Sequence, residues 1–295
     1  NNPEYKSIQG NLTLIKERGN MQSNQVSIAG AITLWELSGR SNYQTLVDGF
    51  DNAGLSQYKP HRPTPLEALK IVLVDLFAGT RSLIRPLDGY KGFGVVYEQA
   101  NGEHLTHHND ISITVTGKGP TDLRFYGTSW SQEQDIITRV TQEMFLVPQA
   151  KLAYSLKRII ESLCGVPIRE SGGIYFIPDP SIPKWNQVAE VIEAAGGNTV
   201  HIIRTAIDDK AVRCVMDHVK QEIADYVAIA SGEVQGGMKD KARENRIVDT
   251  EFMIQKAKWY EKEFGVLLTE STAALGELSV KLMMDGDWAA LSEVT

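Results

Sequence analysis

Apolar residues recur at coiled-coil spacing through the last third of this chain, and this pattern constrains the fold more than any other feature. Between Asp208 and Ser231 the steps alternate between four and three residues, which places these residues on one helix face. After a Gly236-Gly237 break, a seven-residue repeat predicts one long helix from Lys239 to Asp285. Residues 207–295 are therefore predicted to form a coiled-coil-like helical hairpin that serves as an association domain.

The two predicted helices differ in length, at about 35 Å and about 70 Å for a rise of about 1.5 Å per residue. An antiparallel hairpin then leaves roughly half of the long helix without a neighbour. Its apolar stripe is too large to leave in water, so it packs either on the rest of the chain or on another chain. We expect a second chain, and hence a homo-oligomer, while packing in cis stays open. The candidate interface residues are Ile247, Ile254, Phe264, Leu268, Leu275, Leu278 and Leu282.

The preceding segment, residues 28–206, is predicted to be a mixed α+β body with antiparallel β-hairpins and packed helices, and residues 1–27 a polar N-terminal arm. Apolar and polar residues alternate on both sides of Asn101-Gly102, which predicts a hairpin turn there. Helices are predicted over Ser41–Phe50, Glu67–Phe77, Ser131–Phe145, Gln149–Leu163 and Trp185–Ala195. Strands are predicted over Val95–Glu98, Ile111–Thr116, Leu123–Tyr126 and Thr199–Ile207. Ile28–Leu37 is predicted to be a short strand or a turn, and Val166–Pro178 two short strands on either side of a Ser171-Gly172 turn.

Charge and composition narrow the class of partner. The 295 residues carry 30 Lys and Arg against 37 Asp and Glu, a net charge of -7, which argues against broad binding to nucleic acid or anionic lipid but leaves room for a local basic groove. Two cysteines in apolar helical patterns indicate free thiols in a reducing compartment. The longest apolar run, Ile71–Ala78, is far shorter than the roughly 20 residues of a spanning helix. We therefore expect no membrane association.

No residue pattern identifies a catalytic, cofactor-binding or metal site. His104, His107, His108 and Asp110 have metal-ligand chemistry, but their spacing matches no metal motif, and only His104 and His108 share a strand face. Cys164 acts as a nucleophile only with a histidine beside it, and its apolar helical face predicts burial. We expect a protein that is not an enzyme and needs no cofactor, with a site assembled from scattered residues as the remaining alternative.

A weak candidate for nucleic-acid binding lies on the predicted sheet. It consists of Arg81, Arg85, Tyr90, Lys91 and Phe93, because aromatic rings beside cations can stack on bases. A second basic group, at the start of the predicted long helix, is interleaved with acidic residues and indicates a solvated helix face. Nucleic-acid binding is therefore retained as an alternative to protein binding.

Three short segments carry a resemblance. Ser171–Pro178 (SGGIYFIP), together with Arg85–Leu87 and Val95–Glu98, resembles an uncharacterised family of bacteriophage-encoded proteins over roughly residues 60 to 285. That family has no catalytic residues to carry over. The resemblance implies a phage product that acts in the host cytoplasm.

These observations together predict a non-enzymatic phage-type protein that self-associates and binds a host or phage protein complex. Its acidic surface can compete for basic nucleic-acid-binding surfaces, so inhibition of host anti-phage defence is the expected role. The alternative is a nucleic-acid-binding accessory protein of phage DNA metabolism.

Overall fold

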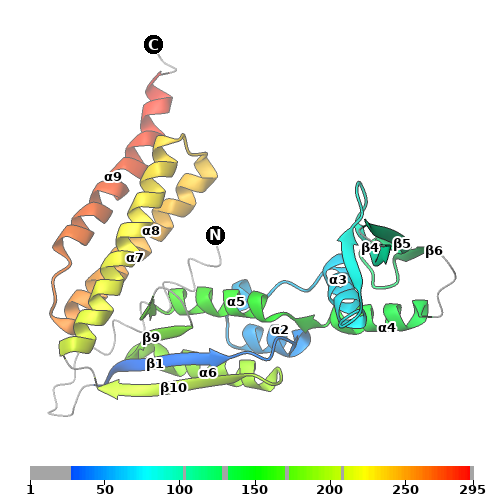
Figure 1. The fold of residues 1–295 in the computed structure, drawn as a ribbon. Coiled ribbons are helices and arrows are strands. Elements are labelled where there is room, and N and C mark those ends of the chain that lie inside the picture. Colours follow the sequence, from blue (N-terminus) through cyan, green and yellow to red (C-terminus); the bar gives the residue numbers. More distant parts are fainter. Residues whose placement is uncertain (1–27, 102–103, 128–131, 170–172, 207–208, 293–295) are drawn as a thin grey trace.

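The chain consists of three parts that follow one another in space (Figure 1): a helical bundle, a central α+β unit and a smaller distal α+β unit. The computed structural model describes residues 28–101, 104–127, 132–169, 173–206 and 209–292. The predicted α+β class with antiparallel sheets is confirmed. The predicted arm, residues 1–27, lies outside the described residues, as do Gly102 of the predicted hairpin turn and Ser131 of a predicted helix start.

The central unit is built on an antiparallel four-stranded sheet with helices on one face. Its strands, in spatial order, are β10 (Thr199–Ala206), β1 (Ile28–Glu36), β9 (Ile174–Pro178) and β8 (Val166–Pro167). The helices are α2 (Tyr43–Asn52), α5 (Gln149–Ser162) and α6 (Ile182–Ala194), and two 3-10 turns are η1 (Ser56–Tyr58) and η2 (Asp179–Ser181). Trp185 is fully buried between helices and sheet, and its indole donates to the Thr33 hydroxyl at 2.9 Å.

Helices α2 and α6 approach each other closely. A Cβ on Gly49 of α2 would lie 2.4 Å from the Val191 Cγ1 of α6, so only glycine fits this contact. Helix α2 is capped by Asn42, whose side chain accepts from the Thr45 backbone at 2.9 Å, and not by Ser41 as predicted. Ser41 is buried, and its hydroxyl accepts from the Asn198 amide.

The distal unit contains a second antiparallel sheet, covered by α3 (Pro65–Leu76) and α4 (Glu133–Glu143). Its strands, in spatial order, are β3 (Ser82–Pro86), β4 (Gly92–Asn101), β5 (His104–Val115) and β6 (Leu123–Gly127). The predicted pairing of β4 with β5, and the predicted third strand β6, are confirmed. A short ribbon of β2 (Ser41–Asn42) and β7 (Leu146–Val147) lies at the connection to the central unit.

The C-terminal bundle has three helices rather than the two predicted: α7 (Asp209–Gln235), α8 (Asp240–Phe264) and α9 (Thr269–Ser292). The prediction of a single helix from Lys239 to Asp285 is wrong. Gly265 has φ 66°, a left-handed conformation that ends α8, and its N–H donates to the Glu261 carbonyl at 2.9 Å. The Glu261 side chain then accepts from the Leu268 N–H at 2.6 Å, just before α9 begins.

The apolar stripe predicted to contact a second chain is packed inside this bundle. Leu268, Leu275, Leu278 and Leu282 are each at most 1% exposed, because α9 folds back beside α7 and α8. The remaining interface candidates, Ile247, Ile254 and Phe264, are half-buried against the same apolar clusters. The stripe therefore packs in cis, and the argument for association through it no longer holds.

A buried polar contact joins the bundle to the central sheet. The Lys256 ammonium of α8 is 1% exposed and donates to both Glu222 carboxylate oxygens at 2.8 Å and to the Gly165 carbonyl at 3.0 Å. The Tyr260 hydroxyl donates to the Cys164 carbonyl at 2.7 Å. These bonds satisfy the backbone between α5 and β8, so the bundle is attached where α5 ends.

Candidate functional site

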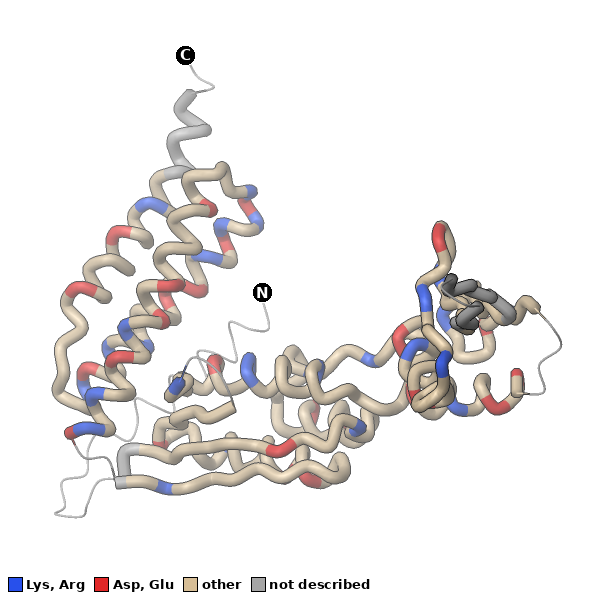
Figure 2. The backbone as a smooth tube through the Cα atoms, viewed as in Figure 1, with Lys and Arg blue, Asp and Glu red and all other residues tan. Residues whose placement is uncertain are grey.

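Helix α5 carries the candidate site. Its apolar residues Leu152, Leu156 and Ile159 are fully buried, and its opposite side bears polar and aromatic residues. Figure 2 shows basic positions along this helix. Two cavities open beside α5, and Arg158 lines both. We call the surface formed by these two cavities the α5 face.

The first cavity, the basic pocket, has a volume of about 290 Å³. None of its lining residues is acidic, and one of them, Tyr154, keeps 65% of its surface exposed. The lining residues are Lys59, Pro60, His61, Ala150, Lys151, Tyr154, Ser155 and Arg158. The pocket thus combines cations with an exposed aromatic ring.

Ion pairs at the rim hold the two pocket lysines in place. The Lys151 ammonium lies 2.9 Å from Glu67, which also forms the capping box of α3 with Thr64. Burial disfavours the charged form of Glu67, but the bonds from Thr64 and Lys151 outweigh it and lower the pKa of Glu67. Lys59 pairs with Asp51 and lowers the pKa of that carboxyl. An ammonium has three donors, so each lysine keeps donors for a ligand.

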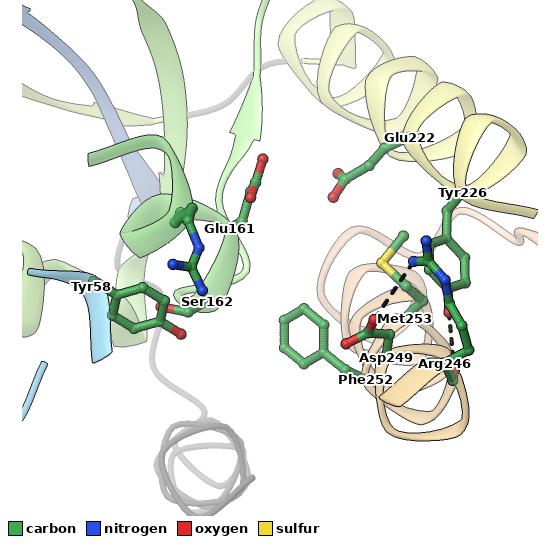
Figure 3. A pocket seen from close by; sticks show the side chains of 10 residues that line it. Tyr58, Glu161, Ser162, Glu222, Tyr226, Arg246, Asp249, Phe252 and Met253 are labelled. Atoms are coloured by element: carbon green, nitrogen blue, oxygen red, sulfur yellow. Dashed lines mark hydrogen bonds and ion pairs between the residues drawn. The ribbon is translucent and has the colours of Figure 1, made fainter. Parts of the chain in front are cut away.

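The second cavity, the junction cavity, has a volume of about 310 Å³ and lies between the central unit and the bundle (Figure 3). Figure 3 shows Glu161 on the α5 side and Glu222 on the α7 side of this gap. Desolvation raises the pKa of Glu161; Lys157 opposes this shift and Glu222 adds to it. The lining residues are Tyr58, Arg158, Glu161, Ser162, Glu222, Tyr226, Arg246, Asp249, Phe252 and Met253.

The bundle wall of the junction cavity is held by Arg246. Its guanidinium donates twice to Glu233, at 2.7 and 2.8 Å, and lies 3.6 Å from Asp249. The side-chain hydrogen bond from Arg246 lowers the pKa of Glu233. The Tyr226 hydroxyl donates to the Arg246 carbonyl at 3.1 Å, and the guanidinium lies 5.7 Å from the Tyr226 ring centroid. These contacts hold the side chains of this wall in fixed positions.

Arg158 stands between the two cavities. Its guanidinium carbon lies 5.3 Å from the ring centroid of Tyr58, a residue that is 5% exposed. This cation–π contact orients the charge between the basic pocket and the junction cavity. The α5 face therefore offers fixed positive charges, an exposed ring and an adjoining cavity, which is the chemistry that binds phosphates and stacks on bases.

The residues that the sequence suggested for nucleic-acid binding lie elsewhere, on the distal unit. Arg81, Arg85, Tyr90 and Lys91 are exposed there, with Tyr90 at 73%. Phe93 is only 8% exposed and packs in the distal core, so its proposed stacking role is wrong. Its side chain faces the helices because β4 presents alternate residues to them.

Sequence reasoning missed Lys59, Lys151, Tyr154 and Arg158. The last three form an i, i+3, i+7 row on α5, a pattern that is present in the sequence but is also typical of an ordinary solvated helix face. Lys59 comes from the segment after η1, and only the fold brings it to α5.

The predicted burial of Cys164 is confirmed, since the residue is 0% exposed and desolvation raises the pKa of its thiol to about 12. The side chains of His104, His107 and His108 lie outside the described residues. Among the side chains that are described, no three His, Cys, Asp or Glu residues are grouped so that they can hold a metal ion. Likewise, no helix within the described ranges has the length and apolar character needed to cross a membrane.

Comparison with known proteins places the chain in a family without giving it an activity. Neither the curated proteins nor the solved structures contained a match to it. One family model, described as a family of unknown function (DUF6744), matches residues 28–292. Because this match covers most of the chain, the protein belongs to the DUF6744 family of unknown function.

Proposed function

We propose that this protein is a non-enzymatic binding protein that holds single-stranded nucleic acid on its α5 face. The observation that carries this proposal is the basic pocket, whose lining includes Lys59, Lys151 and Arg158 together with an exposed ring, Tyr154. Cations in such a groove bind backbone phosphates, and aromatic rings stack on bases without requiring a particular sequence.

The dimensions and charge of the α5 face suit a short contact. Its two cavities, of about 290 and 310 Å³, adjoin at Arg158, and the volume of each is at the lower end of typical ligand sites. The protein carries a net charge of -7, which opposes broad, nonspecific binding. We therefore propose that a few nucleotides bind, with their phosphates on the basic pocket and a base on Tyr154.

The phage setting of this proposal rests on the resemblance of Ser171–Pro178, Arg85–Leu87 and Val95–Glu98 to phage-encoded proteins. In that setting the protein acts in the host cytoplasm as an accessory of phage DNA metabolism.

The test is fluorescence anisotropy with a labelled single-stranded oligonucleotide across a salt series. Three phosphate contacts predict a slope of log K against log salt of about -2, from about -0.7 per phosphate. Tyr154→Ala is expected to weaken binding about 5- to 150-fold, which corresponds to the loss of one stacked base. Lys151→Glu is expected to weaken binding further and to flatten the salt slope.

Matched controls separate the α5 face from the rest of the surface. Tyr90 on the distal unit is 73% exposed, against 65% for Tyr154, so Tyr90→Ala removes a ring of similar exposure. Lys241 on α8 has a side chain that is 79% exposed, so Lys241→Glu makes the same charge change elsewhere. Both controls are expected to bind as the unmodified protein does. Equal losses in Tyr154→Ala and Tyr90→Ala, or no binding at low salt, contradict the proposal.

A second candidate function, binding to a host or phage protein complex as an inhibitor of host defence, is favoured by an apolar surface on α9. Val280, Met283 and Met284 are 51%, 53% and 67% exposed there. A stoichiometric partner that co-purifies with the unmodified protein is then expected to be lost in Val280→Lys. Val74→Lys, at a residue of 49% exposure on α3, is the control that retains it. Retention of the partner in both variants rejects this surface.

A further inference from the structure

Three side chains on one face of α5 connect the two cavities. Tyr154, Arg158 and Glu161 follow one another at spacings of four and three residues, so they form one row along the helix. Tyr154 lines the basic pocket, Glu161 lines the junction cavity, and Arg158 lines both. The outer two lie about 10 Å apart along the helix axis, at about 1.5 Å per residue. A single strand covers this distance in about three nucleotide steps or fewer, at about 3.4 Å or more per step.

The junction cavity presents one carboxylate that a ligand can use. Both Glu222 oxygens accept from the Lys256 ammonium at 2.8 Å, and a guanidinium of the bundle wall lies 3.6 Å from Asp249. Glu161 pairs more loosely with Lys157, whose ammonium lies 3.8 Å away, too far for a hydrogen bond. The Glu161 side chain is 49% exposed. Its two oxygens can therefore accept hydrogen bonds from a ligand in the cavity.

Aromatic rings line the same cavity. Phe252 of α8 is half-buried, and Figure 3 shows its ring directed into the gap toward α5. Tyr58 lies on the α5 side, where the Arg158 guanidinium packs over its ring. The cavity volume of about 310 Å³ is at the lower end of typical ligand sites. A planar base thus finds a ring to stack on and a carboxylate for its edge.

A carboxylate with two available oxygens distinguishes guanine from the other bases. The Watson–Crick edge of guanine carries two adjacent donors, N1–H and the N2 amino group, which match the two oxygens. Adenine and cytosine place a ring-nitrogen acceptor beside their amino group, and thymine places a carbonyl oxygen on each side of N3–H. These acceptors would lie against the negative charge of Glu161, which disfavours all three bases.

We propose that the junction cavity binds a guanine base of the strand held on the α5 face, with the Glu161 carboxylate accepting from guanine N1–H and from its N2 amino group. Phe252 stacks on this base. Arg158 contacts a phosphate between the guanine and the nucleotide on Tyr154. This inference rests on the proposed binding of single-stranded nucleic acid and adds a base preference to it.

Fluorescence anisotropy with short thymidine oligonucleotides tests the base preference. An oligomer with one central guanine is expected to bind about 5- to 150-fold more tightly than those with thymine, adenine or cytosine there, which is the discrimination of one bidentate base contact. Hypoxanthine lacks the N2 amino group and is expected to fall between guanine and adenine. Desolvation raises the pKa of Glu161, so the assay is run at pH 8 to keep the carboxylate ionised.

Glu161→Gln tests the role of the carboxylate. Glutamine keeps the size of the side chain but offers one acceptor and one donor, a pair that matches adenine rather than guanine. This variant is expected to bind the adenine oligomer more tightly than the guanine oligomer. Glu190→Gln makes the same charge change at an exposed residue of α6 that lines neither cavity, and it is expected to keep the guanine preference. A guanine preference that survives Glu161→Gln overturns the proposal.

The oligomer series separates the base preference from strand binding itself. Equal binding of all four oligomers by the unmodified protein rejects the guanine site and leaves strand binding intact. No binding of any oligomer rejects both. Guanosine monophosphate alone is expected to bind more weakly than the guanine oligomer, because it places no further phosphates on the basic pocket. Equal affinity for the two would assign the cavity to a free nucleotide and overturn the proposal.

Discussion

Replacing Lys256 with methionine is expected to weaken the polar contact that joins the C-terminal bundle to the central sheet. The ammonium donates to both carboxylate oxygens of Glu222 at 2.8 Å and to the Gly165 carbonyl at 3.0 Å. Methionine keeps most of the unbranched stem but has no donor. Both acceptors therefore lose their partner while the apolar packing is largely preserved.

The loss in the free energy of unfolding can be estimated from how deeply Lys256 and Glu222 are buried. Breaking a buried ion pair by removing one partner costs about 3–5 kcal/mol. The Lys256 side chain is 1% exposed, but 26% of the Glu222 side chain is exposed, so water partly compensates the carboxylate. We expect Lys256→Met to lower the free energy of unfolding by about 2–4 kcal/mol. At about 2.1 cal/mol/K per residue, a loss of about 3 kcal/mol lowers Tm by about 5 °C if the chain unfolds as one unit.

Urea denaturation followed by circular dichroism measures this loss, and a double-mutant cycle assigns it. Lys256→Met and Glu222→Gln are each expected to lower the free energy of unfolding. The double variant is expected to lose at least about 1 kcal/mol less than the two single losses added together. Lys258→Met, an exposed position on the same helix, is the control and is expected to change stability by less than about 0.5 kcal/mol. Additive effects, or a Lys256→Met loss as small as the control's, refute the reasoning.

Three further outcomes follow from packing and charge. The Cys164 thiol, with its pKa raised to about 12 by burial, is expected to resist alkylation at pH 8 in the native protein and to react after unfolding in urea, as mass spectrometry will show. Gly49→Ala is expected to destabilise by about 1–3 kcal/mol in thermal melts, because its Cβ would lie 2.4 Å from Val191. The hydrogen bond from Arg246 lowers the pKa of Glu233 below its ordinary 4.5. The stability that this ion pair contributes is therefore fully present above pH 4.5 and is lost as the pH falls through the lowered pKa. Glu233→Gln is expected to make denaturation curves less dependent on pH in that range, and an unchanged pH dependence would contradict this assignment.

Local patterns predicted most of the elements, and long-range packing explains where they failed. Helix α5 and strand β10 were predicted within a residue or two, because each has a clear apolar pattern, Gly165 follows α5, and Gly196-Gly197 precede β10. The break at Gly265 was missed because the seven-residue spacing from Glu261 to Leu268 continues across it, and a lone glycine is tolerated within a helical pattern. Because the chain turns at this break, α9 packs beside α7 and α8, and its apolar stripe is buried within the same chain.

The candidate site was less accessible to sequence reasoning than the fold. Lys59 and Lys151 lie far apart in the sequence and meet only because η1 and α5 pack together, so no local spacing indicates the basic pocket. Phe93 was assigned to a surface because aromatic residues near cations suggest stacking, but the pleat of β4 turns its ring into the distal core. The cations and aromatic rings around Tyr90 thus suggested a nucleic-acid surface on the distal unit, whereas the function proposed above rests on a different surface, the α5 face.

Photo-cross-linking to a single-stranded oligonucleotide that carries a photoreactive base is the most direct measurement of the central claim, that a strand lies on the α5 face. Mass spectrometry of the cross-linked peptides is predicted to place the base on the α5 segment that contains Tyr154. The Tyr154→Ala protein is predicted to lose that cross-link. Cross-links confined to the distal turn around Tyr90, or none in α5 at salt concentrations where the strand is bound, would contradict the account.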